Sequence, residues 1–564
     1  MARLVLGPLL RYVGERDAVV WVETDEPCEV EVLGHSARTF QIRRHHYALV
    51  CIEGLEPGRS YEYGVLLDGE RRWPLPDLDA PQSRIRTIDP EVPLGIAFGS
   101  CRVAMPHEPP YTSSKDEDER GFEFDALHVL ARELIRGTRE HWPDALILLG
   151  DQVYVDEGAP VTRAKIRWRR DTTKPPCEEA CTFDEYTWLY HESWGDPLVR
   201  WLLSTVSTSM VWDDHDMRDD WNISRSWVEE MNQHDWWRIR AVDGFMSYWV
   251  YQHVGNLSPS ELADNVIWRR IQGLDDATGV LEDFAERAHQ TGEGARWSHS
   301  RDLGRTRLIV MDSRAGRVLD EERRSIFDEQ EWGWISDRTQ GDFDHLLLAT
   351  SDPFLLIPAM HHVEAWNERV CDGAWGHRAA ELGERLRRGM DLDHWAAFMA
   401  SFERLSKLLE EVGSGHRGEP PASIVVLSGD VHHAYLAEVA FPGRAGVRSA
   451  VYQATCSPFR NPLDKHERVV VRASMMRSLE GFTRALARLA GVPDPPIRWR
   501  ISEGPFFDNQ VASLVIDGRE ATMRLDKTKA GEHHERTLER TFERRLTRPQ
   551  PATGAPARVA AAAS

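Results

Sequence analysis

The most constraining feature of the chain is a series of short, almost uninterrupted apolar runs that begins near residue 94. Runs of this kind are typical of strands buried on both faces of a layered sheet. The predicted strands are LGIAFGSC, DALILLGD, STSMVWDD, TRLIVMDS, HLLLATSD, SIVVLSGD and SAVYQATC. The stretches between them favour helices over residues 122–140, 183–205, 225–255, 275–290 and 376–412. This alternation predicts an α/β domain, which we assign to residues 94–526.

Residues 1–88 follow a different pattern, in which apolar and polar side chains alternate within short runs. The runs include AVVWVET, CEVEVLG and HYALVCIEGL, with Glu-Pro-Gly and Asp-Gly turns among them. This pattern predicts a small antiparallel β-sandwich. The segment LEPGRSYEYGVLLDG resembles the penultimate hairpin of fibronectin type III-like domains, where a Leu-x-Pro-Gly turn precedes an aromatic-rich strand. We interpret the domain as a packing module, with carbohydrate binding as the alternative.

The C-terminal part of the chain changes character twice. The segment VASLVIDGREATMRLDK predicts a hairpin with Asp517 and Gly518 at its turn. From residue 527 the composition becomes highly charged, and the chain finishes with PQPATGAPARVAAAAS. Because such a segment lacks the apolar groups needed to order itself, we predict a disordered tail over residues 527–564.

The charge of the chain limits its partners. With 69 lysines and arginines against 91 aspartates and glutamates, the formal net charge is −22. An acidic protein repels nucleic acids and anionic membranes, so we expect neither a nucleic-acid-binding surface nor a membrane partner. An anionic substrate would have to be attracted locally, by bound cations or a few arginines. No sequence feature indicates a protein partner.

Targeting features point to a cytoplasmic protein. Seven cysteines thinly spread over 564 residues do not resemble a disulfide framework, which favours a reducing compartment. The first 17 residues lack a basic n-region, a twin-arginine pair and a small-residue cleavage site. No apolar run approaches the roughly 20 residues that a membrane-spanning helix needs. We therefore expect a soluble cytoplasmic chain.

Five of the predicted strands end in residues that can bind a metal or stabilise an anion. Ligands of open α/β sheets bind at the carboxyl ends of strands, so separate segments meet at one edge. Helix capping can explain one such ending, but it does not explain five that together carry cysteine, histidine and aspartate. The endings are Ser100-Cys101-Arg102, Gly150-Asp151, Asp213-Asp214-His215-Asp216, Asp312-Ser313-Arg314 and Gly429-Asp430-Val431-His432-His433.

One group of these residues favours a ferric ion. Asp151 follows a strand, and Tyr154 lies three residues later, within reach of the same point. A thiolate from Cys101, a phenolate from Tyr154 and an imidazole from His432 would form an anionic pocket suited to a highly charged transition metal. Asp151 is the candidate for bridging two cations held roughly 3.5–4 Å apart. The alternatives are a helix cap for Asp151 and an inert buried thiol for Cys101.

The remaining candidates surround this group. Asp430 and His432 are one residue apart, so on an extended strand end they face the same side and can reach adjacent metals. Asp214 is the ligand candidate in the WDDHD run, and His215 is the candidate general acid for a leaving oxygen, with a structural role as its alternative. Arg102 and Arg314 are candidate contacts for a phosphoryl oxygen, or else members of structural ion pairs.

In that order along the chain, GSC, GDQVY, WDDH and GDVH resemble the motif set of PhoD-like phosphatases, the alkaline phosphatase D family. The resemblance implies a calcineurin-like, four-layer metallophosphoesterase core behind a fibronectin-like domain. It also implies hydrolysis of phosphate monoesters or diesters by a metal-activated hydroxide. By this similarity Cys101, Asp151, Tyr154 and His432 would hold Fe³⁺, whereas Asp151, Asp214 and Asp430 would serve Ca²⁺, with His215 beside the phosphate.

The sequence departs from that family in two respects. Asp219 and Asp220 stand where relatives carry asparagine, which would alter the preference for the second cation, so other divalent ions remain open there. Exported members also carry a twin-arginine signal, so their polymeric extracellular substrates are not inherited automatically. The alternatives to a phosphatase are a phosphodiesterase or nucleotidase using the same site, and a catalytically degenerate binding or scaffold protein.

Overall fold

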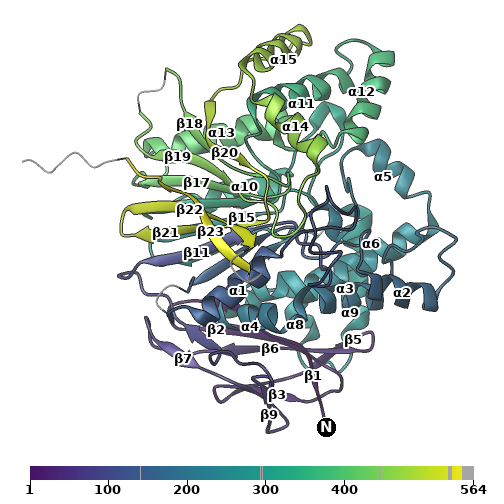
Figure 1. Cartoon of the computed structure of the whole chain (residues 1–564), viewed down its shortest axis with the longest axis vertical. Coiled ribbons are helices and arrows are strands. Elements are labelled where there is room, and N and C mark those ends of the chain that lie inside the picture. The colour runs from purple at the N-terminus through teal and green to yellow at the C-terminus, as the bar shows by residue number, and fades with distance from the viewer. Residues whose placement is uncertain (140–141, 293, 295, 444–445, 531–535, 549–564) are drawn as a thin grey trace, which may run out of the picture.

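Strands β1 to β10 form an antiparallel β-sandwich at the N-terminus, at the bottom of the molecule in Figure 1. The computed structural model describes residues 1–139, 142–292, 294, 296–443, 446–530 and 536–548. One sheet has the order β1-β2-β6-β5 and the other the order β4-β3-β8-β9, and β7 pairs with β10. The strands are Leu4–Val13, Ala18–Thr24, Glu29–Val32, His35–Arg38, Phe40–Ile42, His45–Ile52, Ser60–Glu62, Val65–Leu67, Glu70–Trp73 and Arg84–Arg86. The likeness of this sandwich to fibronectin type III domains stays a prediction.

The centre of the molecule consists of two mixed sheets. Among the described residues, one sheet has the order β13-β12-β11-β21-β22-β23 and the other the order β14-β15-β16-β17-β19-β18-β20. Each of the predicted buried strands is present, so the predicted α/β class is confirmed. The strands of the first sheet are β11 Leu94–Gly99, β12 Ala145–Leu149, β13 Ser207–Val211, β21 Gln510–Asp517, β22 Glu520–Ala530 and β23 Arg536–Arg545. Those of the second are β14 His299–Leu303, β15 Thr306–Met311, β16 His345–Thr350, β17 Ser423–Ser428, β18 Ala434–Ala440, β19 Ala450–Thr455 and β20 Arg498–Phe506.

Both faces of the second sheet are buried, which explains the continuous apolar runs. Leu308 and Val310 of β15 belong to the same core as β12, whereas Ile309 packs on the other face with Phe402 and Leu405 of α13 (Met399–Ser414). Because side chains of a strand alternate between faces, a strand between two layers must be apolar throughout. Helices α1 (Ala126–Arg136) and α4 (Pro197–Thr205) cover the outer side of the first sheet, giving four layers (Figure 1).

The remaining helices lie around these sheets, and the predicted helical segments are interrupted more often than their periodicity suggests. The segment 183–205 is broken at Gly195, and Asp196 caps a new helix. Helix α6 (Asp235–Tyr248) continues into a π-helical turn over Trp249–His253. The other helices are α2 Pro160–Arg169, α3 Phe183–Trp194, α5 Arg225–Met231, α7 Pro259–Asp264, α8 Val266–Ile271, α9 Thr278–Thr291, α10 Glu329–Arg338, α11 Pro358–Cys371, α12 His377–Gly389, α14 Lys465–Ser474 and α15 Arg477–Leu489. Short 3₁₀ turns lie at Asp214–Asp216, Val254–Asn256, Glu321–Arg323 and Trp395–Ala397. Among the helices that the structure describes, none has the length and apolar character needed to cross a membrane.

The predicted disordered tail is wrong for residues 527–530 and 536–545, which form strands. Residues 527–530 continue β22, and β23 pairs with β22 along its length. The charged residues that suggested disorder form cross-strand ion pairs, such as Arg540 with Asp526 at 2.5 Å and Arg524 with Glu543 at 2.8 Å. Opposite charges facing each other across a ladder stabilise the pairing. Residues 531–535 and 549–564 of the predicted tail lie outside the described residues.

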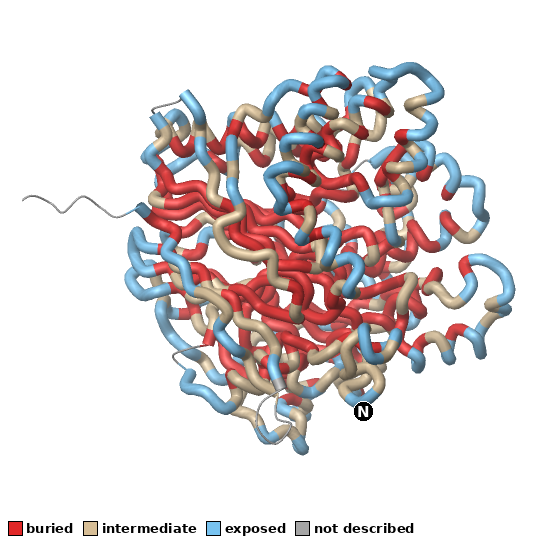
Figure 2. The backbone as a smooth tube through the Cα atoms, turned by 45° about the horizontal axis from the view of Figure 1, so that its top comes forward, coloured by how far each residue is buried: buried red, intermediate tan, exposed pale blue. Residues whose placement is uncertain are grey.

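The β-sandwich and the α/β domain share a core. Figure 2 shows buried backbone running through the middle of the molecule. All seven residues of β2 are buried, because one face of the strand packs inside the sandwich and the other packs against the α/β domain. The buried guanidinium of Arg11 donates hydrogen bonds to the carbonyl oxygens of Tyr251 and Gln252 at 2.5 and 2.6 Å. The N-terminal domain therefore contacts the π-helical turn directly.

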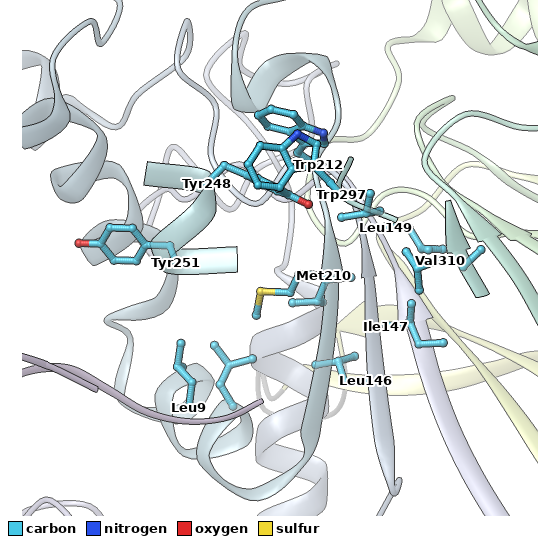
Figure 3. Close-up of a cluster of buried hydrophobic side chains, with 14 of the residues drawn as sticks. Leu9, Leu146, Ile147, Leu149, Met210, Trp212, Tyr248, Tyr251, Trp297 and Val310 are labelled. Atoms are coloured by element: carbon cyan, nitrogen blue, oxygen red, sulfur yellow. The ribbon is translucent and has the colours of Figure 1, made fainter. Parts of the chain in front are cut away.

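An aromatic cluster packs against Tyr248, the residue that precedes the π-helical turn. The Trp212 ring stacks on Tyr248 with centroids 4.0 Å apart and meets Trp297 edge-on (Figure 3). Trp212 directly follows β13, so the cluster fixes the point where this strand leaves the sheet. The tryptophan-rich helix therefore serves packing, at the base of the loops that follow β13.

Candidate metal centre

The loops after β11, β12 and β17 bring Cys101, Asp151 and His432 together, with ligand atoms within 4.8 Å of one another. Tyr154 joins them, since its hydroxyl donates a hydrogen bond to Asp151 Oδ2 at 3.1 Å. The amide of Asn461 lies 3.3 Å from the Tyr154 hydroxyl and 3.5 Å from His432 Nε2. The four residues predicted as one ligand group therefore occupy one place.

Four residues of this site have an unusual backbone conformation, which orients their side chains. Cys101, Asp151, Asp430 and His432 have φ angles of 55°, 54°, 64° and 51°, in the left-handed region that residues other than glycine rarely adopt. Strained backbone of this kind clusters at functional sites, where surrounding structure maintains it.

Only glycine fits sterically at the position that precedes Asp151. Gly150 has a φ of 109°, and a Cβ atom on it would lie 2.6 Å from the Asp213 Cβ. The close approach of these two strand ends therefore requires glycine at this position.

A second group of carboxylates adjoins the first. Ligand oxygens of Asp151, Asp213 and Asp214 lie within 4.8 Å of one another, and so do those of Asp213, Asp352 and Asp430. Asp214 and Asp430, predicted to serve the second cation, face a common point, because Arg314 Nη2 lies 3.7 Å from an oxygen of Asp214 and 3.6 Å from one of Asp430. Asp151 belongs to the group with Cys101 and His432 and also to the group with Asp213 and Asp214, as a bridging carboxylate would.

Asp156 and Tyr154 fix the orientation of His215 beside the predicted ligands. Its Nδ1 lies 2.9 Å from Asp156 Oδ1, and its ring stacks on Tyr154 with centroids 4.4 Å apart. Burial would lower the pKa of His215, but the carboxylates of Asp156 and Asp214 outweigh that effect and raise the pKa. These carboxylates therefore favour the protonated ring, and Asp156 engages Nδ1. Nε2 lies 3.7 Å from an oxygen of Asp219, a side chain that is 63% exposed, so this side of the centre opens to solvent.

The predicted substrate contact of Arg102 is wrong. Its guanidinium is buried and donates to Asp125 Oδ2 at 3.0 and 2.7 Å, and also to Ser193. The side chain therefore points away from Cys101 and anchors helix α1, which Asp125 caps.

Arg314 lies at the centre, buried among carboxylates. It is 1% exposed, and it forms ion pairs with Asp213, Asp352 and Asp393. These ion pairs fit the alternative structural role of Arg314, and its contact with a substrate stays a prediction. A buried guanidinium placed among carboxylates offsets their mutual repulsion.

Sequence reasoning missed the residues that support the ligands. Asp216 accepts hydrogen bonds from the backbone amides of Asp151, Val153 and Asp213, and from the Gln252 side chain at 3.0 Å. As the last residue of WDDHD, Asp216 was visible in the motif. Asp156 follows the GDQVY motif by two residues, and its pairing with His215 gives no local signal.

Another missed element is a buried carboxylate–imidazole–carboxylate chain. His394 Nδ1 lies 2.7 Å from Glu364 Oε1, and its Nε2 lies 2.7 Å from Asp430 Oδ2. Such outer partners orient metal-ligating carboxylates. The segment containing His394 was predicted as part of a helix, whereas it lies just before a short turn at Trp395–Ala397.

The donors fit cations. Burial raises the pKa of Asp151 and of the Cys101 thiol, so neither would ionise without a positive charge beside it. Within the described part of the chain, Asp151 Oδ1 is buried and accepts no hydrogen bond. Burial also lowers the pKa of His432 to about 3, which keeps its imidazole neutral and able to ligate. A metal ion would satisfy all three donors at once.

Comparisons with known proteins agree with this architecture. A family model described as PhoD-like phosphatase matches residues 131–468, and one described as a domain of unknown function (DUF7800) matches residues 1–85. The PhoD-like segment contains each predicted ligand except Cys101. The chain has no match among curated protein sequences.

Two solved structures share the fold. One, titled as the structure of PhoD, is 14% identical with a TM-score of 0.57, over 98% of this chain and 94% of the other. The other is purple acid phosphatase PPD1 from yellow lupin (Lupinus luteus) seeds, 9% identical with a TM-score of 0.50, over 96% of this chain and 74% of the other. At these identities the similarity establishes the fold of the molecule.

Proposed function

The chain belongs to the PhoD-like phosphatase family, and from that premise we propose that it hydrolyses phosphoric esters at the centre formed by Cys101, Asp151, Tyr154 and His432. The observation that carries the proposal is the grouping of these donors around a buried Asp151 oxygen without a hydrogen bond. A structural cluster would pair that oxygen, whereas a metal centre leaves it available.

The donor chemistry supports a mixed pair of cations. Cys101, Asp151, Tyr154 and His432 would hold Fe³⁺, because a thiolate, a phenolate and an imidazole suit a transition metal. Asp151, Asp214 and Asp430 would hold Ca²⁺ or another divalent cation through oxygen alone. Bound there, the cations would activate a water as nucleophile and polarise the phosphoryl oxygens.

His215 would then serve as the general acid. With Nδ1 held by Asp156, its Nε2 carries the proton that the leaving oxygen needs when the bond to phosphorus breaks. The solvent-exposed side near Asp219 is where the ester's leaving group would emerge. Arg314 would hold Asp213 and Asp352 in place beside the ligands rather than contact the ester.

Metal content and the visible spectrum of protein purified without added metal test the centre. We expect about one iron per chain and a charge-transfer band that Tyr154→Phe shifts or removes. Asp151→Asn should lose that band and hydrolysis while keeping the fold, as checked by circular dichroism. Full activity in Asp151→Asn would falsify the bridging role, and the absence of stoichiometric metal would favour a scaffold protein.

Substrate class requires a separate assay. Hydrolysis of 4-nitrophenyl phosphate would identify a monoesterase, bis(4-nitrophenyl) phosphate a diesterase, and nucleoside monophosphates a nucleotidase. These activities share the cations, so only the rates distinguish them.

A further inference from the structure

A second group of potential metal ligands lies outside the centre described above. It consists of His107 in the loop between β11 and α1, His128 on α1, and Asp196 at the start of α4. Their ligand atoms all lie within 4.8 Å of one another. Figure 1 shows α1 and α4 side by side under the first sheet, and the two helices are in contact.

The spacing of the group suits a tetrahedral cation. His107 Nε2 lies 3.6 Å from Asp196 Oδ2, and His128 Nδ1 lies 3.2 Å from Asp196 Oδ1. A tetrahedral zinc with ligands at about 2.0–2.1 Å separates neighbouring ligand atoms by about 3.3 Å. The distance of 3.6 Å is too long for a hydrogen bond but suits two ligands of one metal.

Asp196 is oriented before any ion binds. Its Oδ1 accepts hydrogen bonds from the backbone amides of Leu198 and Val199 at 3.0 and 3.1 Å, which is the N-terminal cap of α4. This anchoring directs Oδ2 towards His107. A carboxylate fixed in this way loses little conformational freedom when it ligates.

His107 lacks the hydrogen bonds that a buried imidazole needs. Its side chain is 24% exposed, and within the described residues Nδ1 is buried without a hydrogen-bond partner, while Nε2 has only the long contact to Asp196. The His107 and His128 rings are 4.1 Å apart, and burial lowers the pKa of His107 to about 4. A neutral imidazole can ligate through Nε2, which faces Asp196 at 3.6 Å, beyond hydrogen-bond distance.

The imidazole ligands, and not the nearby charges, favour zinc over a hard cation. Asp125 is paired with Arg102, while Arg460 and Arg536 donate to the carbonyl oxygens of Pro106 and His107 at 3.0 and 3.3 Å. These guanidinium groups oppose a weakly held calcium ion. Imidazole ligands give a stronger bond to zinc, which can overcome that repulsion.

We propose that His107, His128 and Asp196 bind a zinc ion that is separate from the catalytic cations. The ion would tie the loop after Cys101 to the ends of α1 and α4. The same loop carries Lys115, whose Nζ lies 3.2 Å from Asn461 Oδ1, and Asn461 contacts Tyr154 and His432. The zinc would therefore stabilise a loop that borders the catalytic centre.

Zinc titration followed by metal analysis of the full chain tests the site. Wild type should retain one more zinc per chain than His107→Gln or Asp196→Asn, and added zinc should raise the thermal midpoint of wild type alone. Asn caps helices about as well as Asp, so Asp196→Asn keeps α4 intact while weakening ligation. We expect zinc binding at this site to weaken more than about 100-fold, since even outer partners of a metal cost about 10–100-fold.

The controls separate this site from the catalytic one. His377→Gln removes a histidine that is 88% exposed and should bind zinc like wild type. Asp151→Asn should lose iron but keep the additional zinc, so the site is tested whether or not the chain is a phosphatase. Equal zinc content in wild type, His107→Gln and Asp196→Asn would overturn the proposal.

Discussion

Single residues at the catalytic centre depend on distant partners for their chemistry. Two partners fix the orientation of His215. Asp156, 59 positions earlier, contacts Nδ1, and the ring stacks on Tyr154. A carboxylate at Nδ1 stabilises the protonated imidazole, in which Nε2 also carries a proton to donate. The orientation of His215, and with it the proposed acid role, thus rests on Asp156.

Asp156→Asn should therefore lower kcat about 10²–10⁴-fold, the usual contribution of a general acid. The loss should be greater for phenyl phosphate than for 4-nitrophenyl phosphate, because a poor leaving group needs the proton more. Steady-state rates on the two esters measure this difference.

His215→Asn provides the matched comparison. The double variant should be no slower than His215→Asn alone, because both changes remove one function. Equal losses on the two esters, or additive losses in the double variant, would contradict the assignment.

The sequence predicted which residues meet at the centre but not the residues that support them. Cys101, Asp151, Tyr154 and His432 were identifiable because strand ends meet at a sheet edge, which is a rule of topology. The partners Asp156 and His394 were not, since their contacts depend on tertiary packing that no local pattern encodes. Arg102 was misassigned for the same reason, because adjacency to Cys101 in sequence does not fix where its side chain points.

At the level of elements, the join between a strand and its loop is the most constrained feature. Gly150 directly follows β12, with a backbone conformation and a close contact that exclude a side chain. Gly481 in α15 has a different environment, because it is exposed and a Cβ atom added to it would meet no other atom within 4 Å.

Gly150→Ala should destabilise the protein by about 2–4 kcal/mol, combining left-handed backbone strain with overpacking. Gly481→Ala should instead stabilise it by up to about 1 kcal/mol, as in other helix interiors. Urea unfolding of both variants measures the difference, and a Gly150→Ala protein as stable as wild type would refute the steric argument.

The element that the sequence misrepresented is β23. Its charged composition resembles a disordered segment, yet most of its charges have cross-strand partners, and Leu546 just beyond it is fully buried. A prediction from composition counts these charges without their positions, so it misses their pairing across the strands.

Leu546→Ala should cost about 2–5 kcal/mol, as for other buried leucines. Val469→Ala, at a position that is 61% exposed, should change stability by less than about 0.5 kcal/mol. Thermal unfolding distinguishes the two variants. If Leu546→Ala left the stability unchanged, the segment after β22 would not be packed against the domain.

For the molecule as a whole, the contact between the two domains contains a buried ionic cluster. His45 of the sandwich lies 3.1 Å from Glu23 and 3.1 Å from Asp184 of α3. Burial would lower the pKa of His45, but hydrogen bonds to Asp184 and Glu23 outweigh it and raise the pKa to about 9. The contact is therefore strongest while His45 is charged.

The pH dependence follows from that shift. Because the folded-state pKa of about 9 exceeds the ordinary histidine value of 6.5, the contribution of His45 is fully present below pH 6.5 and is lost as the pH rises through 9. Wild type should lose thermal stability over this range more steeply than His45→Gln. Parallel changes of the thermal midpoint in the two proteins between about pH 6 and 9.5 would exclude the role of His45.

The buried Arg11 links the N-terminal domain, which ends near residue 88, to the centre of the α/β domain. Arg11 holds the carbonyl oxygens of Tyr251 and Gln252, and the Gln252 side chain binds Asp216, which fixes the amide of Asp151. A recombination event that exchanged the first domain for a foreign sandwich would remove a contact that supports the loop carrying Asp151. Selection on hydrolysis then acts on both domains together, so the two are expected to be inherited as a unit and to diverge in step.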